Sequence, residues 1–239
     1  MNHNNTAYKP NGESSLAITS KSFSKNKALR DAVLSIYPNT KFNNEGIIFK
    51  EKQLIEFLDG QDMAIIGLEE INENIIKKLP KLKIISKYGV GIDMIDLNAL
   101  YDHKVYLGWQ GGINKRSVSE LVIALIINLL RKIQIVNNDL SNNNWNQLVG
   151  CQLTGKTVGI IGLGNIGKDL VELLQPFKCK VLANDILSFP KFCDLHNVEQ
   201  VDLKYLLQES DVISIHVPLD KSTELMIGES ELSLMKANS

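Results

Sequence analysis

The chain has almost no net charge and no long apolar run, and each shortage excludes a class of protein. Its 239 residues include 26 basic and 27 acidic side chains, and the formal net charge of −1 offers little electrostatic attraction for nucleic acid. The longest apolar run, residues 121–130, is interrupted by Asn128 and is too short to span a bilayer. We therefore expect neither a nucleic-acid partner nor a membrane segment.

Cysteines are also scarce. Cys151, Cys179 and Cys193 are unevenly spaced, odd in number and form no Cys-x-x-Cys pair, which favours free thiols in a reducing compartment over disulfides or a zinc site. The first 14 residues are polar and lack the apolar segment of a signal peptide. We expect residues 1–14 to be a disordered tail and the protein to be cytoplasmic.

The most informative segment contains three glycines at the spacing Gly-x-Gly-x-x-Gly. Gly162, Gly164 and Gly167 follow an apolar run at residues 157–161 and open a stretch with helical periodicity. In a dinucleotide site the first glycine permits a tight turn, the second lets the backbone approach a pyrophosphate, and the third allows close packing of helix on strand. The alternative is a glycine-rich turn in an ordinary strand-helix-strand unit.

Asp185 supports the dinucleotide interpretation. It ends a second apolar run at residues 181–183 and lies 18 residues after Gly167, close to the spacing of the acid that binds an adenine ribose. A carboxylate there repels a 2′-phosphate, and no Arg follows within ten residues to neutralise one. The pattern favours NAD over NADP.

Short β-type runs alternate with helical patterns from residue 16 onward, which is typical of α/β proteins. In the first half we expect strands at 16–19, 64–67, 82–86 and 105–107 and helices at 28–36, 71–78 and 95–101. A long apolar helix over 117–138 and a polar stretch at 137–146 then lead to a second unit, with strands at 157–161, 180–184 and 212–217 and a helix at 229–235. We assign residues 15–110 and 111–239 to two flavodoxin-like or Rossmann-like domains with mostly parallel sheets.

The second domain is expected to be incomplete at its C-terminal side. A dinucleotide site needs strands on both sides of the first strand, and only one helix follows Val217. The strand at 212–217 should therefore present an unpaired edge.

Four segments carry a resemblance to a known family, in matching order and spacing from residue 16 onward. They are residues 87–96 (KYGVGIDMID), 116–120 (RSVSE), 153–167 (LTGKTVGIIGLGNIG) and 210–219 (SDVISIHVPL). With them the chain resembles the D-isomer-specific 2-hydroxyacid dehydrogenases, which include phosphoglycerate dehydrogenase. The resemblance implies hydride transfer between NAD and a small 2-hydroxy or 2-oxo acid, with residues 15–110 as the substrate-binding domain and 111–239 as the NAD-binding domain.

The resemblance also implies roles for individual residues. Gly89, Val90 and Gly91 match the loop whose backbone N–H groups bind the substrate carboxylate, and Val90 would also lie near the nicotinamide. Two glycines after a buried strand do suit an anion-binding turn, although a plain strand-to-helix turn is the alternative. The further cofactor-binding positions that the resemblance implies, beside the three glycines and Asp185, are Asn165, Ile166, Val217 and Pro218. The helix at 117–138 matches the element through which family members form homodimers.

The catalytic side chains of the family match no position in this chain. The family uses an Arg for the substrate carboxylate, a His for the proton and a Glu that holds the His. Arg30, Arg116 and Arg131 occur in other segments, and His216 matches a position in the cofactor wall. We assign no catalytic residue and no metal site, and we expect a C-terminally truncated chain that is inactive alone. The alternatives are a non-catalytic NAD-binding regulatory protein and an inactive remnant of the family.

Overall fold

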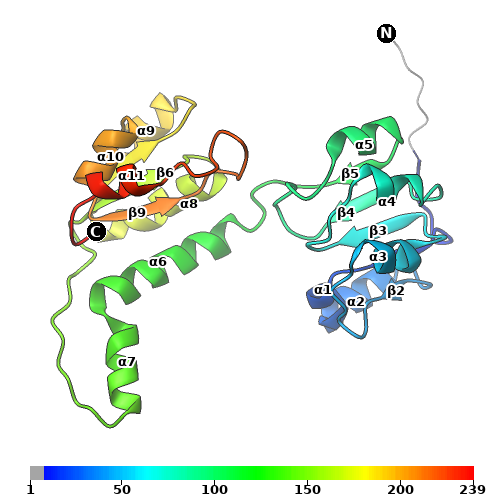
Figure 1. Ribbon diagram of the computed structural model, residues 1–239, viewed down its shortest axis with the longest axis horizontal. Coiled ribbons are helices and arrows are strands. Elements are labelled where there is room, and N and C mark those ends of the chain that lie inside the picture. The colour runs from blue at the N-terminus through cyan, green and yellow to red at the C-terminus, as the bar shows by residue number, and fades with distance from the viewer. Residues whose placement is uncertain (1–7) are drawn as a thin grey trace. The chain divides into compact units, whose positions relative to one another are not determined.

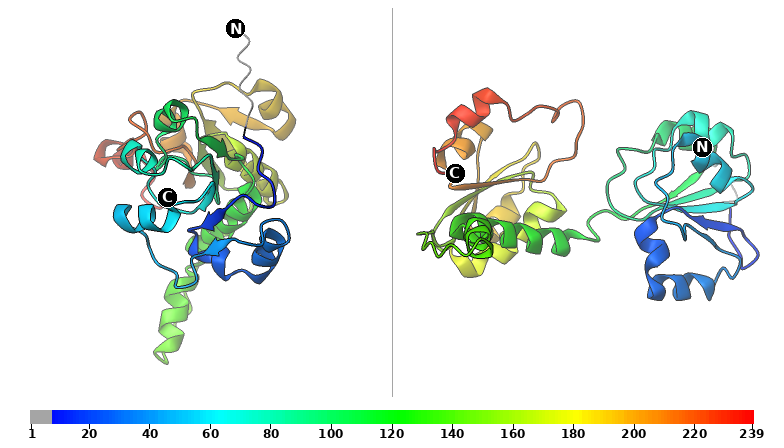
Figure 2. Two further views of the ribbon diagram at one scale, coloured as in Figure 1. Left: turned by 90° about the vertical axis from the view of Figure 1, so that its right-hand side faces the viewer. Right: turned by 60° about the horizontal axis from the view of Figure 1, so that its bottom comes forward.

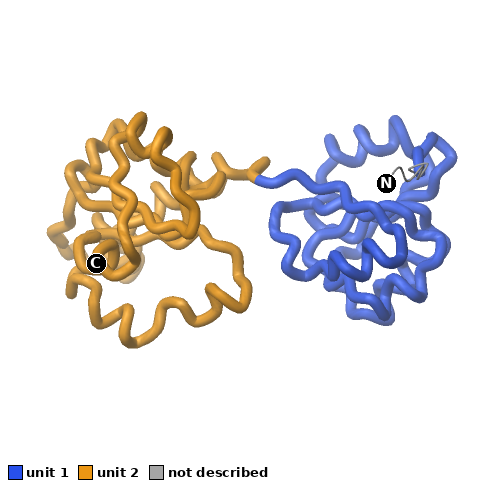
Figure 3. The backbone as a smooth tube through the Cα atoms, turned by 90° about the horizontal axis from the view of Figure 1, so that it is seen from above, with its two compact units in different colours: residues 1–111 blue, residues 112–239 orange. Residues whose placement is uncertain are grey.

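The computed structural model describes residues 8–239, and contacts divide the chain between Gly111 and Gly112 into two units (Figure 3). Residues 1–7 of the expected tail lie outside the described residues. Tyr8 packs against the core of unit 1, and its hydroxyl lies 2.8 Å from Oγ of Ser14. No helix in the described part of the chain is long and apolar enough to cross a membrane.

Unit 1 is a parallel five-stranded sheet with helices on both faces (Figure 1). Its strands are β1 (Leu16–Ile18), β2 (Lys41–Phe42), β3 (Met63–Ile66), β4 (Ile84–Lys87) and β5 (Tyr106–Gly108), in the order β2-β1-β3-β4-β5. Its helices are α1 (Lys21–Lys25), α2 (Lys27–Leu34), α3 (Glu51–Leu58), α4 (Glu73–Lys77) and α5 (Leu97–Asp102).

Alternation along the strands gives this sheet two cores. Ala17, Ala64 and Ile85 point to the face covered by α3, α4 and α5. Leu16 and Ile18, on either side of Ala17, point to the face covered by α1 and α2. Because side chains alternate with a period of two, apolar strands of this length must be covered on both faces.

Unit 2 is a parallel four-stranded sheet, again between two layers of helices (Figure 2). Its strands are β6 (Thr157–Ile161), β7 (Lys180–Asn184), β8 (Val198–Gln200) and β9 (Val212–Ile215), in the order β8-β7-β6-β9. Its helices are α6 (Lys115–Arg131), α7 (Ile133–Ser141), α8 (Asn165–Leu174), the 3₁₀ turn η1 (Gln175–Phe177), α9 (Pro190–His196), α10 (Leu203–Glu209) and α11 (Glu229–Leu234).

The strand order of unit 2 reverses between β6 and β9. Helices α6, α8 and α9 pack on one face of the sheet, and α10 packs on the other. The order corresponds to the first four strands of a doubly wound dinucleotide-binding sheet, in which ligands bind beyond the carboxyl ends of the strands where the order reverses. Among the described residues β9 pairs only with β6, as expected for an edge strand.

The α/β fold with two mostly parallel sheets is confirmed, but the single helix expected at 117–138 is wrong. The helix breaks at Lys132, which has a left-handed backbone with φ of 55°. The side chain of Asn128 accepts a hydrogen bond from the backbone N–H of Gln134 at 3.1 Å, which supports the start of α7. The sequence patterns also missed β2, β8 and helices α1, α3, α9 and α10, which are short or lie between stronger signals.

Candidate dinucleotide-binding site

The turn from β6 into α8 is formed by the glycine fingerprint. Gly162 has a φ of +97°, and a Cβ there would lie 2.8 Å from the backbone carbonyl group of His216. A Cβ on Gly167 would lie 2.2 Å from the carbonyl oxygen of Gly162, so helix and turn pack too closely for any side chain. A Cβ on Gly164 would meet no atom of the described residues within 4 Å. Two glycines are therefore required by packing, and the third leaves open space above the turn.

The N-terminus of α8 begins at this open space. Gly164 and Asn165 are exposed, and no side chain among residues 8–239 caps the helix. The first N–H groups of a helix have no partner within it and carry a partial positive charge. An uncapped, exposed helix start behind a glycine with room beside it fits the pyrophosphate of a dinucleotide.

Asp185 follows β7 and lies against the glycine turn. Its carboxylate accepts hydrogen bonds from the backbone N–H of Leu163 at 2.6 Å and of Leu187 at 2.8 Å. These bonds hold one acidic group beside the helix start and leave lone pairs that can accept ribose hydroxyls. Asp185, which the sequence spacing singled out, therefore lies in direct contact with the glycine turn.

The loop after β9 lies beside the turn, although about 50 residues separate the two in sequence. A Cβ on Gly162 would lie 3.0 Å from Cγ1 of Val217, and Pro218 follows on the exposed side. Nε2 of His216 lies 2.9 Å from Oγ of Ser214, and burial lowers the pKa of the imidazole. The imidazole of His216 therefore contacts its own strand and favours its neutral form.

In unit 1 the loop Gly89-Val90-Gly91 leaves β4. Gly89 has a φ of +129°, a conformation that favours glycine, and Gly89 and Gly91 are exposed. The indole N–H of Trp109 donates to the carbonyl oxygen of Val90 at 2.9 Å and holds the loop from one side. The backbone of this loop is thus both open to solvent and fixed in shape.

A lysine lies directly before this loop. The ammonium of Lys87 donates to the carbonyl oxygen of Gly67, and burial lowers the pKa of Lys87 while Glu69 and Asp93 act against that effect. A cation therefore lies two residues from Gly89, next to a turn suited to anions.

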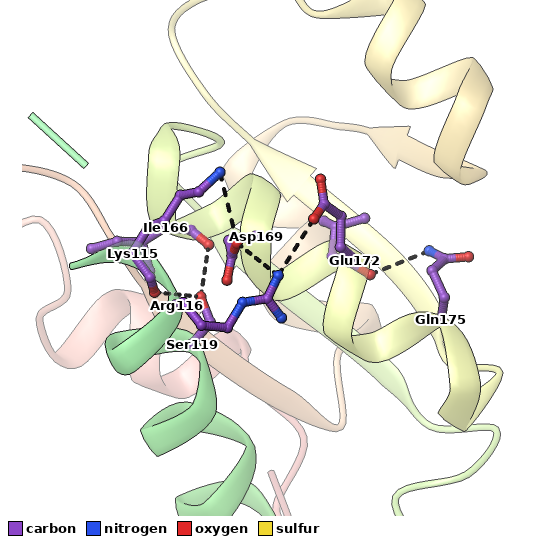
Figure 4. Close-up of polar contacts among 8 residues, drawn as sticks. Lys115, Arg116, Ser119, Ile166, Asp169, Glu172 and Gln175 are labelled. Atoms are coloured by element: carbon purple, nitrogen blue, oxygen red, sulfur yellow. Dashed lines mark hydrogen bonds and ion pairs between the residues drawn. The ribbon is translucent and has the colours of Figure 1, made fainter. Parts of the chain in front are cut away.

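A buried ion pair links α8 to the start of α6 (Figure 4). The side chain of Asp169 is 1% exposed and lies 3.1 Å from Nη2 of Arg116 and 3.8 Å from Nζ of Lys115. The hydroxyl of Ser119 donates to the carbonyl oxygen of Lys115 at 3.0 Å and contacts that of Ile166 at 3.4 Å. The second turn of α6 is thereby held on the first turns of α8.

The residues expected at the cofactor site gather at one end of the unit 2 sheet. The three glycines, Asn165, Ile166 and Asp185 surround the start of α8, and Val217 and Pro218 lie in the adjoining loop. Gly89, Val90 and Gly91 form their own turn in unit 1. Asp169 was missed, although a carboxylate three residues after Ile166, within an apolar helical face, was a visible signal.

Comparison with known proteins agrees with these features. Residues 123–239 match the model of the D-isomer specific 2-hydroxyacid dehydrogenase, NAD binding domain. The chain is 30% identical over 214 residues to a glyoxylate reductase of Thermococcus litoralis, covering 86% of this chain and 63% of the relative. It is 33% identical over 190 residues to a hydroxypyruvate reductase of Thermotoga maritima, covering 78% and 61%.

A solved structure of D-lactate dehydrogenase from Aquifex aeolicus, complexed with NAD and lactic acid, superposes with a TM-score of 0.77 at 26% identity, covering 93% of this chain and 66% of that one. The chain spans less than two thirds of the length of the glyoxylate reductase and of the hydroxypyruvate reductase. The matches include the glycine turn and the carboxyl end of β9. The chain belongs to the D-isomer-specific 2-hydroxyacid dehydrogenase family and carries its NAD-binding domain.

Proposed function

We propose that this chain forms the NAD-binding and carboxylate-binding parts of a dehydrogenase acting on a small 2-hydroxy or 2-oxo acid. The observation that carries the proposal is the uncapped start of α8 behind Gly164, with room for a phosphate and with Asp185 beside it. In this proposal residues 111–239 bind the cofactor, residues 15–110 bind the substrate, and residues 1–14 take no part.

The geometry of unit 2 supports a set of proposed cofactor contacts. The N–H groups at Asn165 and Ile166 donate to the pyrophosphate, because they lie in the first turn of α8. Asp185 accepts the ribose hydroxyls, and its negative charge disfavours the 2′-phosphate of NADP. Val217 and Pro218 form the apolar wall beside the cofactor, and the half-buried His216 supports that wall.

The substrate contacts are proposed for the exposed turn of unit 1. Backbone N–H groups of Gly89, Val90 and Gly91 bind the carboxylate, because a positive φ at Gly89 turns the chain as anion-binding turns require. Lys87 adds a nearby positive charge. The carboxylate is shared by glyoxylate, pyruvate and hydroxypyruvate, so this turn selects a class of acid.

The chemistry supplied by bound NAD is hydride exchange at the nicotinamide. A protein group must also transfer a proton to or from the substrate oxygen. We do not assign that step to His216, because its ring nitrogen already lies 2.9 Å from Oγ of Ser214 and the resemblance assigns this position to the wall beside the cofactor. We therefore propose that the 239 residues by themselves bind cofactor without appreciable turnover.

We propose a second copy of the chain as the partner of α6 and α7. Leu121, Leu125 and Leu129 follow one another at four-residue spacing on α6, and they are 58%, 49% and 78% exposed. Ile133 and Ile135 at the start of α7 are about half exposed and extend this apolar stripe along the chain. Exposed apolar stripes of this kind occur at protein interfaces.

The cytoplasmic location remains a prediction from the three free cysteines.

Calorimetric titration of the 239-residue protein with NADH and NADPH tests the proposal. We expect NADH to bind and NADPH to bind at least about tenfold more weakly, because of the charge of Asp185. Reduction of pyruvate, glyoxylate or hydroxypyruvate should stay at the rate of a protein-free control. Absence of NADH binding would contradict the cofactor proposal, and robust turnover would contradict the proposed inactivity.

Two alternatives are distinguished by NADH titration combined with light scattering and thermal unfolding. A non-catalytic NAD-dependent regulator would bind NADH and change its assembly state with it, measured by light scattering. An inactive remnant would show neither binding nor a cooperative thermal transition.

A further inference from the structure

The buried carboxylate of Asp169 lies under the proposed phosphate site. Asp169 is four residues after Asn165, so it lies about 6 Å further along the axis of α8. Its side chain is 1% exposed, and neither carboxylate oxygen accepts a hydrogen bond from a described residue. A buried negative charge this close to the helix start opposes binding of a negatively charged diphosphate.

Two cations of α6 compensate this charge. Nη2 of Arg116 lies 3.1 Å from Oδ1 of Asp169, and Nζ of Lys115 lies 3.8 Å from the same oxygen. Nη2 of Arg116 also lies 3.7 Å from the exposed carboxylate of Glu172. Both cations come from the first turn of α6 and are half exposed. The net charge below the phosphate site therefore depends on α6.

We propose that Arg116, assisted by Lys115, is an electrostatic positioning residue that neutralises Asp169 and so permits the start of α8 to bind a dinucleotide diphosphate. This inference rests on the proposed function. Arg116 acts through Asp169 and does not itself contact the cofactor.

The roles of charge and of packing give different patterns of variants. If the pair only holds two helices together, loss of either partner weakens NADH binding similarly. If Arg116 neutralises Asp169, Arg116→Gln weakens binding because it exposes the diphosphate to an uncompensated carboxylate. Asp169→Asn removes the repulsion itself and should not weaken binding.

The experiment is NADH titration of the 239-residue protein and four variants, with thermal unfolding of each as a check of folding. We expect about tenfold weaker binding for Arg116→Gln, the effect of one added charge at roughly 8–10 Å in a medium of intermediate dielectric constant. Asp169→Asn and the double variant should bind at least as tightly as the wild type. Glu172→Gln, which removes an exposed partner of the same guanidinium, is the matched control and should stay within about twofold.

Equal losses in Arg116→Gln and Asp169→Asn, or no loss in Arg116→Gln, would overturn the inference while leaving the proposed function intact. Failure of the wild type to bind NADH would overturn both. If Arg116→Gln does not fold, Lys115→Gln replaces it, with an expected loss of about threefold because this cation is more distant. Unchanged binding by that variant would likewise overturn the inference.

Discussion

Replacement of Gly167 by Ala should disrupt the cofactor site by steric conflict alone. Alanine in place of glycine ordinarily stabilises a helix by about 1 kcal/mol. Here the new Cβ would lie 2.2 Å from the carbonyl oxygen of Gly162 and 3.2 Å from Cγ2 of Ile160, about 1 Å short of ordinary contact with the oxygen. Overpacking of this kind costs about 3 kcal/mol, so the conflict exceeds the helix gain and leaves a net loss of about 2 kcal/mol.

Thermal unfolding followed by circular dichroism, together with NADH titration, measures both consequences. A loss of about 2 kcal/mol should lower the Tm of unit 2 by roughly 8 °C. Gly164→Ala is the matched control, because its Cβ meets nothing within 4 Å and its main cost is a poorer N-cap of about 1 kcal/mol or less. That variant should keep most of its stability and still lose NADH binding, since the Cβ fills the space proposed for the phosphate.

Equal Tm values for Gly167→Ala and the wild type would refute the packing argument. Full NADH affinity in Gly164→Ala would refute the assignment of that open space to the cofactor.

The remaining predictions concern other parts of the chain. Asp185→Asn should narrow the preference for NADH over NADPH about tenfold, measured by titration with both, because it removes a charge near the 2′ position and keeps an acceptor; an unchanged ratio would contradict the role of Asp185. Leu129→Glu should convert a dimer to a monomer in light scattering, since it places a charge in the apolar stripe of α6; a variant that remains dimeric would exclude this stripe as the interface. Gly89→Ala should cost about 1–3 kcal/mol in thermal unfolding, because alanine strains the positive φ of that residue, and an unchanged Tm would argue against the turn geometry. Hydrogen bonds from the hydroxyl of Ser15 and, to a smaller extent, from its backbone N–H lower the pKa of Asp62 in the folded protein. The ionised carboxylate therefore stabilises the fold at pH values above 3.8, the ordinary pKa of an Asp side chain. This stabilisation is lost as the pH falls through the folded-state pKa. Asp62→Asn should therefore be less stable than the wild type by about 1 kcal/mol at pH 7, the value for a largely solvated charged hydrogen bond, and the two should converge in acid unfolding; a difference that persists at the lowest pH would contradict this cause.

The residues proposed for the cofactor site could be named from the sequence because their signals are local. The glycine spacing fixes a turn, the apolar run before it fixes a strand, and the position of Asp185 follows from the length of one helix and one strand. The short elements β2, β8 and α9 were missed, since two to seven residues carry too little periodicity. Their formation depends on neighbouring strands and helices.

The break at Lys132 illustrates the limit of periodicity. The apolar pattern continues through residues 121–136, yet the backbone turns left-handed at Lys132 and the Asn128 side chain binds the N–H of Gln134. The spacing of apolar residues does not predict a hydrogen bond between a side chain and a backbone group six residues away.

The sequence by itself determined the alternation of the more strongly patterned strands and helices, the glycine turn and the acid that follows it, because each depends on residues close together in the chain. Only the tertiary structure decided which distant loops meet: the reversal of strand order brings the loop of His216 and Val217 against Gly162. It also decided that Asp169 is buried against Arg116, because burial and pairing of a charge depend on how α6 packs on α8.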